Sequence, residues 1–210
     1  RIGPSGVPPE ILAALQTTLL FASAATSIGV TAGLVIAYSV RRLSGRSSAA
    51  VVTLASIGYA TPGTVVAIAI LPTVAGVDRL LGVVVDALSG RVIGLLFLGS
   101  GMAVLYAYFV RFLAVTVGGA ESASAKLPRS LDDAAATLGA VPRERMWHVH
   151  LPLIRRAMAA SAVLMFVDCM KELPATLLLR PFNFETLATH VYSFASIEQL
   201  EQASLGALTI

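Results

Sequence analysis

Residues 11–40 read ILAALQTTLLFASAATSIGVTAGLVIAYSV, a run of 30 residues without a formal charge. Two more uncharged runs follow at residues 47–77 and 92–110, with 31 and 19 residues. A helix needs about 20 mostly apolar residues to cross the hydrocarbon of a bilayer. These three runs therefore predict three transmembrane helices.

The composition of the whole chain agrees with a membrane protein. Of its 210 residues, 56% are hydrophobic and 13% are charged, whereas a soluble domain carries about 25% charged residues. Such low charge excludes an ordinary cytosolic enzyme, a disordered tail and a nucleic-acid-binding domain. The 15 Lys and Arg residues are scattered, so no nucleic-acid partner is expected. A single cysteine, Cys169, excludes an internal disulfide and a Cys-based zinc site.

Two further helices are predicted towards the C-terminus. Residues 151–179 form a fourth apolar stretch, although three charged residues interrupt it. A fifth helix is predicted to begin at Gln202, and the sequence ends while that stretch is still apolar. The expected fold is thus an all-α transmembrane bundle of about five spans, with the last span cut short.

The beginning of the sequence also favours a piece of a longer protein. Arg1 takes the place of an initiating methionine, and residues 1–9 do not have the layout of a signal peptide. Residues 1–210 are therefore expected to form a single transmembrane domain that is a fragment of a longer membrane protein.

The basic residues predict the orientation of the helices, because basic loops face the cytoplasm. Four lie in the connections expected outside (Arg1, Arg79, Arg91 and Arg180). Ten follow the first and third predicted helices, and they are Arg41, Arg42, Arg46, Arg111, Lys126, Arg129, Arg143, Arg145, Arg155 and Arg156. The connection at residues 118–156 is therefore expected inside, and residues 78–91 and 180–201 outside.

Small residues and prolines in the apolar runs suggest how the helices pack. Gly29 and Gly33 form a G-x-x-x-G pair, which allows close backbone contact between helices. An Ala-rich chain also produces such pairs without a contact, so both interpretations stay open. Pro62 removes a backbone donor and predicts a kink in the second helix. That kink could be a static bend or part of a moving gate.

The inside connection carries signals for two short helices. Ser130 precedes Asp133 by three residues, which is the spacing of a capping box. Gly139 can take the left-handed conformation that ends a helix, and Pro142 suits the first position of the next one. The sequence therefore predicts a helix, a glycine turn and a second helix on the cytoplasmic surface.

The same connection resembles the EAA loop of binding-protein-dependent ABC transporter permeases. The family motif reads E-A-A-x3-G-x9-I-x-L-P, and every spacing agrees. Only the Asp for Glu and the Val for Ile depart from it. The matching residues are Asp133, Ala134, Ala135, Gly139, Val149, Leu151 and Pro152.

Further stretches resemble the ferric-iron branch of that family. They are GYATPGT at residues 58–64, KELPATLLLRP at 171–181 and ETLA at 185–188. Permeases for thiamine and for phosphonates are close relatives of that branch, so these cargoes remain alternatives.

The resemblance implies a bacterial inner-membrane permease with a five-helix core. Its loop, within residues 118–156, would dock onto a separate ABC ATPase subunit. A second permease half or subunit and an external solute-binding protein would complete the importer. No stretch resembles the phosphate-binding motif G-x-x-x-x-G-K-[ST]. We therefore expect neither ATP hydrolysis nor a bound cofactor on this chain.

Three charges in the fourth stretch need an explanation, because ionisable side chains are costly in a membrane. Asp168, Lys171 and Glu172 are spaced to share one helix face. They could line the path of the cargo, or they could form a structural ion pair with the second acid reaching the outer interface. His148 and His150 lack the spacing of a helical metal site.

Two other classes of function compete with the importer. The chain could be a transporter driven by an ion gradient, with Asp168 and Glu172 as ion sites. An intramembrane enzyme is disfavoured, because no recognisable catalytic pairing is present.

Overall fold

The computed structural model describes residues 8–43, 46–91 and 94–208, and the regular structure within them is helical. Three described helices, α1, α3 and α5, are long and apolar enough to cross a membrane. In chain order the elements are α1 (Pro9–Arg42), α2 (Arg46–Ala60), α3 (Gly63–Ser89), α4 (Leu96–Gly99), α5 (Met102–Ser124), α6 (Arg129–Thr137), α7 (Pro142–Glu144), the π-helix η1 (Arg145–His150), α8 (Leu151–Met170), α9 (Pro174–Leu179), α10 (Leu187–Ser196) and α11 (Leu200–Ala207).

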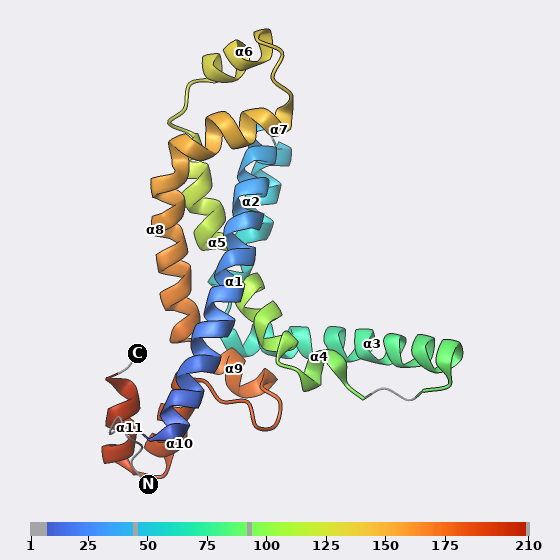
Figure 1. Cartoon of the computed structure of the whole chain (residues 1–210), viewed down its shortest axis with the longest axis vertical. Coiled ribbons are helices and arrows are strands. Elements are labelled where there is room, and N and C mark those ends of the chain that lie inside the picture. The colour runs from blue at the N-terminus through green and yellow to red at the C-terminus, as the bar shows by residue number, and fades with distance from the viewer. Residues whose placement is uncertain (1–7, 44–45, 92–93, 209–210) are drawn as a thin grey trace.

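Helices α1, α2, α5 and α8 form an elongated bundle (Figure 1). Small residues bring α1 close to its neighbours. A Cβ atom added at Gly29 would lie 2.5 Å from Sδ of Met165, and one added at Gly33 would lie 2.6 Å from Oγ1 of Thr116. That hydroxyl donates a hydrogen bond of 2.8 Å to the carbonyl of Gly29. The structure therefore decides between the two interpretations of the G-x-x-x-G pair in favour of a close helix contact.

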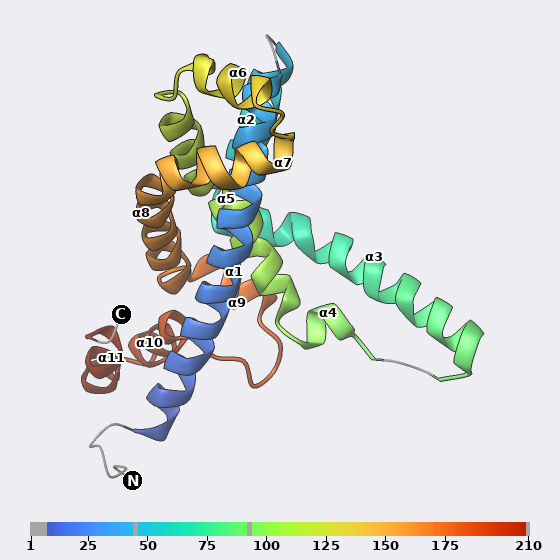
Figure 2. The ribbon, with the colours of Figure 1, turned by 45° about the horizontal axis from the view of Figure 1, so that its top comes forward.

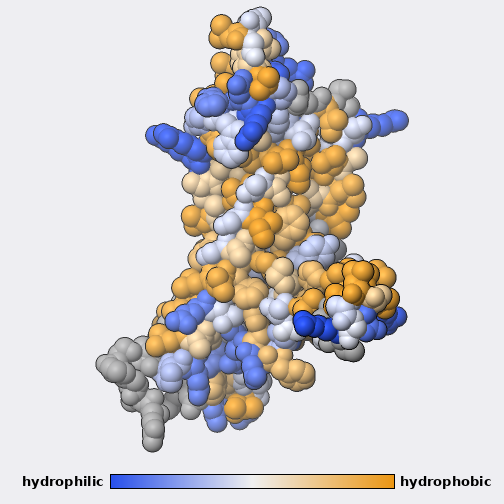
Figure 3. Space-filling model, turned by 45° about the vertical axis from the view of Figure 1, so that its right-hand side comes forward, coloured by the Kyte–Doolittle hydropathy of each residue, from blue (hydrophilic) through white to orange (hydrophobic). Residues whose placement is uncertain are grey.

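The surface of the bundle is apolar in the middle and polar towards the ends. In the space-filling view, hydrophobic residues cover the central part, and hydrophilic residues gather above and below it (Figure 3). This distribution is the one that a bilayer requires, because the hydrocarbon contacts the middle of a spanning protein and water contacts its ends.

Helix α3 leaves the bundle and extends away from it (Figures 1 and 2). Most of its large apolar side chains are therefore exposed, and they include Val65, Ile68, Leu80, Val83, Val84 and Leu88. Apolar side chains at this density need cover from lipid or from another protein surface.

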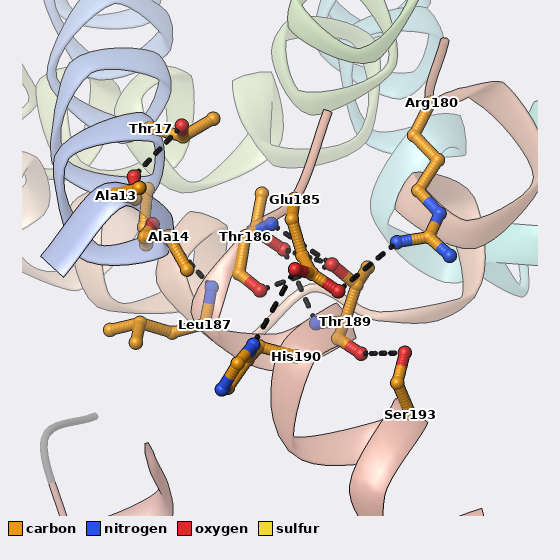
Figure 4. Close-up of polar contacts among 11 residues, drawn as sticks. Ala13, Ala14, Thr17, Arg180, Glu185, Thr186, Leu187, Thr189, His190 and Ser193 are labelled. Atoms are coloured by element: carbon orange, nitrogen blue, oxygen red, sulfur yellow. Dashed lines mark hydrogen bonds and ion pairs between the residues drawn. The ribbon is translucent and has the colours of Figure 1, made fainter. Parts of the chain in front are cut away.

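The end of the bundle opposite α6 is closed by α10 and α11, which pack near the start of α1 (Figure 1). The N–H of Leu187 donates to Oγ1 of Thr18 at 2.8 Å and so joins α10 to α1. Nearby, Glu185 lies between Arg180 and His190, with ion-pair distances of 3.8 and 3.5 Å (Figure 4). These contacts fix the connection between α9 and α10.

The structure corrects the limits of the second and third spans. Residues 47–77 belong to two helices, because the helical structure is interrupted at Thr61 and Pro62. The helix α5 begins and ends later than the predicted run at residues 92–110, so Arg111 lies inside it. The charge rule ended the span at Arg111, but the apolar residues after that arginine continue the helix.

Residues 78–91 were expected to be an external loop, but most of them belong to α3. Asp78 is buried, and its carboxylate accepts the backbone N–H groups of Leu96, Phe97 and Leu98 at 3.1, 2.9 and 3.1 Å. Since these hydrogen bonds satisfy the charge, Asp78 does not end the apolar helix.

The later helices also differ from the prediction. The stretch at residues 151–179 breaks after Met170 and resumes as α9. The connection expected at residues 118–156 is shorter at both ends, because α5 reaches Ser124 and α8 starts at Leu151.

At the C-terminus, the helix predicted from Gln202 begins at Leu200 as α11. The leader at residues 1–7 and the last two residues, 209–210, lie outside the described part. A fifth span therefore stays a prediction.

Candidate functional site: a braced loop and a junction of helix breaks

The loop that carries the motif forms the predicted pair of short helices. The helix α6 ends before Gly139, whose φ of +83° is left-handed, and α7 starts at Pro142. Both of these predictions are confirmed. The capping box at Ser130 is wrong, because α6 begins at Arg129 and has no side-chain cap. A carboxylate cap occurs at α7 instead, where Glu144 accepts the N–H of Val141 at 3.0 Å.

The motif residues divide between α6 with the turn that follows it and the segment where η1 continues into α8. Asp133, Ala134 and Gly139 are exposed, and Ala135 is half-buried. On the other side, Pro152 is exposed and Val149 and Leu151 are half-buried.

Residues 129–147 also present apolar side chains to the outside, and we call these residues the coupling surface. The exposed apolar side chains are Leu131, Leu138, Val141 and Trp147, and Leu138 is 87% exposed. Arginines and acids surround them in the sequence. Apolar side chains within a polar rim are typical of a surface that another protein covers.

Arg41, near the end of α1, holds this surface in place. Its Nε lies 2.9 Å from Oδ2 of Asp132 in α6. Its Nη1 and Nη2 donate to the carbonyls of Ser124 and Leu127 at 2.6 and 3.0 Å. One guanidinium therefore connects α1, the end of α5 and α6.

His150 and Tyr38 complete this contact, and we call Tyr38, Arg41, Asp132 and His150 the loop clamp. Nε2 of the buried His150 lies 2.6 Å from Oδ1 of Asp132. Tyr38 packs edge-on against the His150 ring at 5.2 Å and donates its hydroxyl to the carbonyl of Pro142 at 2.9 Å. Partial burial opposes ionisation of Asp132, but the hydrogen bonds from His150 and Arg41 lower its pKa below the ordinary value.

Arg111 forms a second polar site, inside the bundle. Its Nε lies 3.0 Å from Oε2 of Glu172, whose side chain is 5% exposed. Its Nη1 donates to the carbonyl of Thr61 at 3.2 Å. Arg111 thus contacts the break between α2 and α3 and the break between α8 and α9, and we call this site the helix-break junction.

Glu172 also organises the start of α9. Its Oε1 accepts the N–H of Ala175 at 3.2 Å, and its carbonyl accepts the hydroxyl of Thr176 at 2.8 Å. The Thr176 hydroxyl lies 2.7 Å from the hydroxyl of Tyr108 in α5. Glu172 therefore serves as a cap for α9, and its charge is balanced by Arg111.

The three charges predicted to share one helix face do not do so. Asp168 lies in the last turn of α8, but the helix ends at Met170 and Glu172 follows the end. Lys171 pairs with Asp168 at 2.8 Å; the lysine side chain is 62% exposed, whereas the Asp168 side chain is 7% exposed. Glu172 pairs with Arg111, and its side chain is 5% exposed.

Sequence reasoning missed Arg111 as the partner of Glu172 because it placed that arginine beyond the end of the third span, on the cytoplasmic side. It also used Arg41 only for orientation and did not connect it with Asp132. The apolar residues after Arg111, FLAVTVGGA, were the available signal that the third helix continues. No group of three His, Cys, Asp or Glu side chains that could hold a metal ion occurs in the described part of the chain.

The chain is similar to several known permeases. It is 33% identical over 107 residues to PhnV of Salmonella typhimurium, named as a 2-aminoethylphosphonate transport system permease protein, covering 51% of the chain and 40% of the relative. It is 26% identical over 192 residues to the ferric transport system permease protein FbpB of Actinobacillus pleuropneumoniae, covering 91% and 25%.

A third relative is the Fe(3+)-transport system permease protein FbpB 2 of Haemophilus influenzae, 30% identical over 107 residues, covering 51% of the chain and 21% of the relative. The matches thus span less than half the length of each of these relatives. The model of the family described as "Binding-protein-dependent transport system inner membrane component" matches residues 29–198, most of the chain. The chain therefore belongs to this family of membrane transport permeases.

Proposed function

We propose that the chain is the permease subunit of an ATP-driven importer in the bacterial inner membrane. It forms part of the translocation path and transmits the closure of a separate ATPase to that path. The coupling surface carries this proposal. It exposes apolar side chains in and beside two short helices, among them Leu138 in the turn after α6, and the loop clamp fixes this segment to α1. Such a rigid unit can pass a displacement on to the bundle.

For the cargo, we propose ferric iron. Support comes from the FbpB proteins, whose names state ferric or Fe(3+) transport, and one of these matches covers 91% of the chain. A phosphonate is the second candidate, because PhnV has the higher identity over a shorter stretch. Uptake of radioactive Fe³⁺ and of 2-aminoethylphosphonate by the assembled transporter, each with its binding protein, separates the two cargoes.

We place the path of the cargo beside the ion pair of Asp168 and Lys171. Lys171 is exposed at the break between α8 and α9, and irregular backbone within a membrane is tolerated where protein or a water-filled cavity surrounds it. The exposed apolar face of α3 is assigned to a second permease half or subunit, since the described part of the chain leaves most of the large apolar side chains of that helix exposed. An external binding protein delivers the cargo at the opposite end from the coupling surface.

The coupling role is tested by changing Leu138 to Ser. The side chain is 87% exposed, so its loss leaves the bundle intact. If the ATPase buries this leucine, affinity falls by the transfer free energy of the side chain, about 2 kcal/mol or roughly 30-fold in Kd. The measurement is binding of the purified ATPase subunit to the permease in nanodiscs.

Leu208→Ser is the matched control, because that leucine is 85% exposed at the other end of the bundle. The affinity of the Leu208→Ser permease for the ATPase is expected to equal that of the wild type. Equal affinity of the Leu138 variant would sink the coupling proposal. Uptake that continues without ATP and stops when the proton gradient collapses would instead support a gradient-driven transporter.

A further inference from the structure

The helix-break junction joins two interruptions that are distant in the sequence. One is at Thr61 and Pro62, where α2 gives way to α3. The other is at residues 171–173, where α8 gives way to α9. Arg111 contacts both, through the carbonyl of Thr61 and the carboxylate of Glu172.

Each interruption leaves backbone groups that need a partner. The ends of helices have unsatisfied N–H and C=O groups, and such groups are costly inside a membrane. The ion pair supplies one partner on each side. Arg111 donates to the carbonyl of Thr61, and Glu172 accepts the N–H of Ala175. If the ion pair separates and its side chains turn away, each break loses the hydrogen bond that the pair supplies.

The backbone at Gly63 packs closely against this ion pair. A Cβ atom at Gly63 would lie 2.5 Å from Oε1 of Glu172 and 2.7 Å from Nη1 of Arg111. The glycine at the first position of α3 therefore allows the carboxylate and the guanidinium to approach the backbone. Because the approach is this close, a change in direction of α3 displaces the ion pair as well.

A purely structural role makes a different prediction. A buried ion pair can often be replaced by apolar side chains of similar volume without loss of stability. If the pair only fills and neutralises the space, an apolar replacement therefore preserves both the fold and the activity. If the pair links two moving segments, an apolar replacement preserves the fold and loses the linkage.

We propose that Arg111 and Glu172 are positioning residues that couple the two helix breaks, so that the α2–α3 and α8–α9 breaks change together when the ATPase closes. This inference rests on the proposed function and goes beyond it. It assigns to one ion pair, separate from the coupling surface, the transmission of the ATPase's closure within the membrane.

The test compares the wild type with the double variant Arg111→Met/Glu172→Leu in proteoliposomes that contain the complete transporter and its binding protein. Cargo imported per ATP hydrolysed is the readout. We expect the double variant to assemble and hydrolyse ATP, with about tenfold less cargo per ATP. Arg91→Gln is the control, since it removes an exposed arginine that lies after α3 and outside both helix breaks, and it should leave the ratio unchanged.

A wild-type ratio of cargo to ATP in the double variant would overturn the proposal. If that variant fails to assemble, Glu172→Gln decides, because the amide oxygen can still accept the N–H of Ala175 while the charge is lost. A lowered ratio in Glu172→Gln supports the coupling role, and an unchanged ratio refutes it. A wild-type transporter that imports nothing with ATP would contradict the proposed function instead, whatever the variants do.

Discussion

The contact between α2 and α5 leads to a sharp prediction for Gly58→Ala. A Cβ atom at Gly58 would overlap the carbonyl oxygen of Val110 and lie 2.8 Å from its carbonyl carbon and 3.2 Å from Cα of Arg111. These are backbone atoms, so no side chain can turn away to relieve the overlap. The two helices must separate, and the separation moves the residue that carries the helix-break junction.

The size of the effect follows from two opposing contributions. Overpacking of a close contact costs about 1–3 kcal/mol, and the upper end applies because both surfaces are backbone. Replacing a helical glycine by alanine returns roughly 0.5–1 kcal/mol. The net loss is about 2 kcal/mol, or roughly 30-fold in the equilibrium between folded and unfolded protein.

The assay is unfolding in mixed micelles with increasing SDS, followed by circular dichroism. Gly118→Ala is the matched control, because Gly118 lies in α5 with no atom within 4 Å of an added Cβ. The control should be as stable as the wild type or slightly more stable. If Gly58→Ala unfolds at the same SDS fraction as Gly118→Ala, the close packing of α2 on α5 is refuted.

Two further predictions concern the carboxylates of Asp132 and Asp78. The pKa of Asp132 is lowered in the folded protein. The ionised carboxylate therefore stabilises the folded loop above the ordinary pKa of aspartate, and this stabilisation is lost as the pH falls through the lowered value. Protease cleavage of the loop should therefore stay slow at pH 5 and become faster below about pH 4. The variant Asp132→Asn should be cleaved quickly at pH 7, and slow cleavage of that variant would contradict the loop clamp. Asp78→Ala leaves three N–H groups at residues 96–98 without their acceptor, so hydrogen exchange there should accelerate by about tenfold or more, while unchanged exchange would show that α4 does not depend on Asp78.

The sequence predicted the helical class of the fold because apolar runs of this length have few alternatives. Helix limits are harder to predict, because a charged residue does not always end a span. Asp78 and Arg111 both lie inside helices, where backbone N–H groups or a distant acid satisfy them. Such partners are contributed by residues remote in the sequence, so spacing along the chain does not reveal them.

The loop was predicted more completely, because its signals are local. The left-handed Gly139 and the position of Pro142 depend on neighbouring residues, and both are found as expected. The loop clamp depends on tertiary contacts between Arg41, Asp132 and His150, which lie far apart in the chain. The G-x-x-x-G pair lies between these cases, since the pattern allowed a contact that only packing could confirm.

Replacement of Gly139 tests the central claim, that this loop transmits the action of a separate ATPase to the membrane helices. Proline fixes φ near −65° and cannot adopt the observed φ of +83°, whereas asparagine tolerates the left-handed conformation. In reconstituted transporter, Gly139→Pro is expected to insert into the membrane normally but to lose ATP-driven uptake and binding of the ATPase, while Gly139→Asn retains both. Normal ATP-driven uptake by Gly139→Pro would contradict the claim.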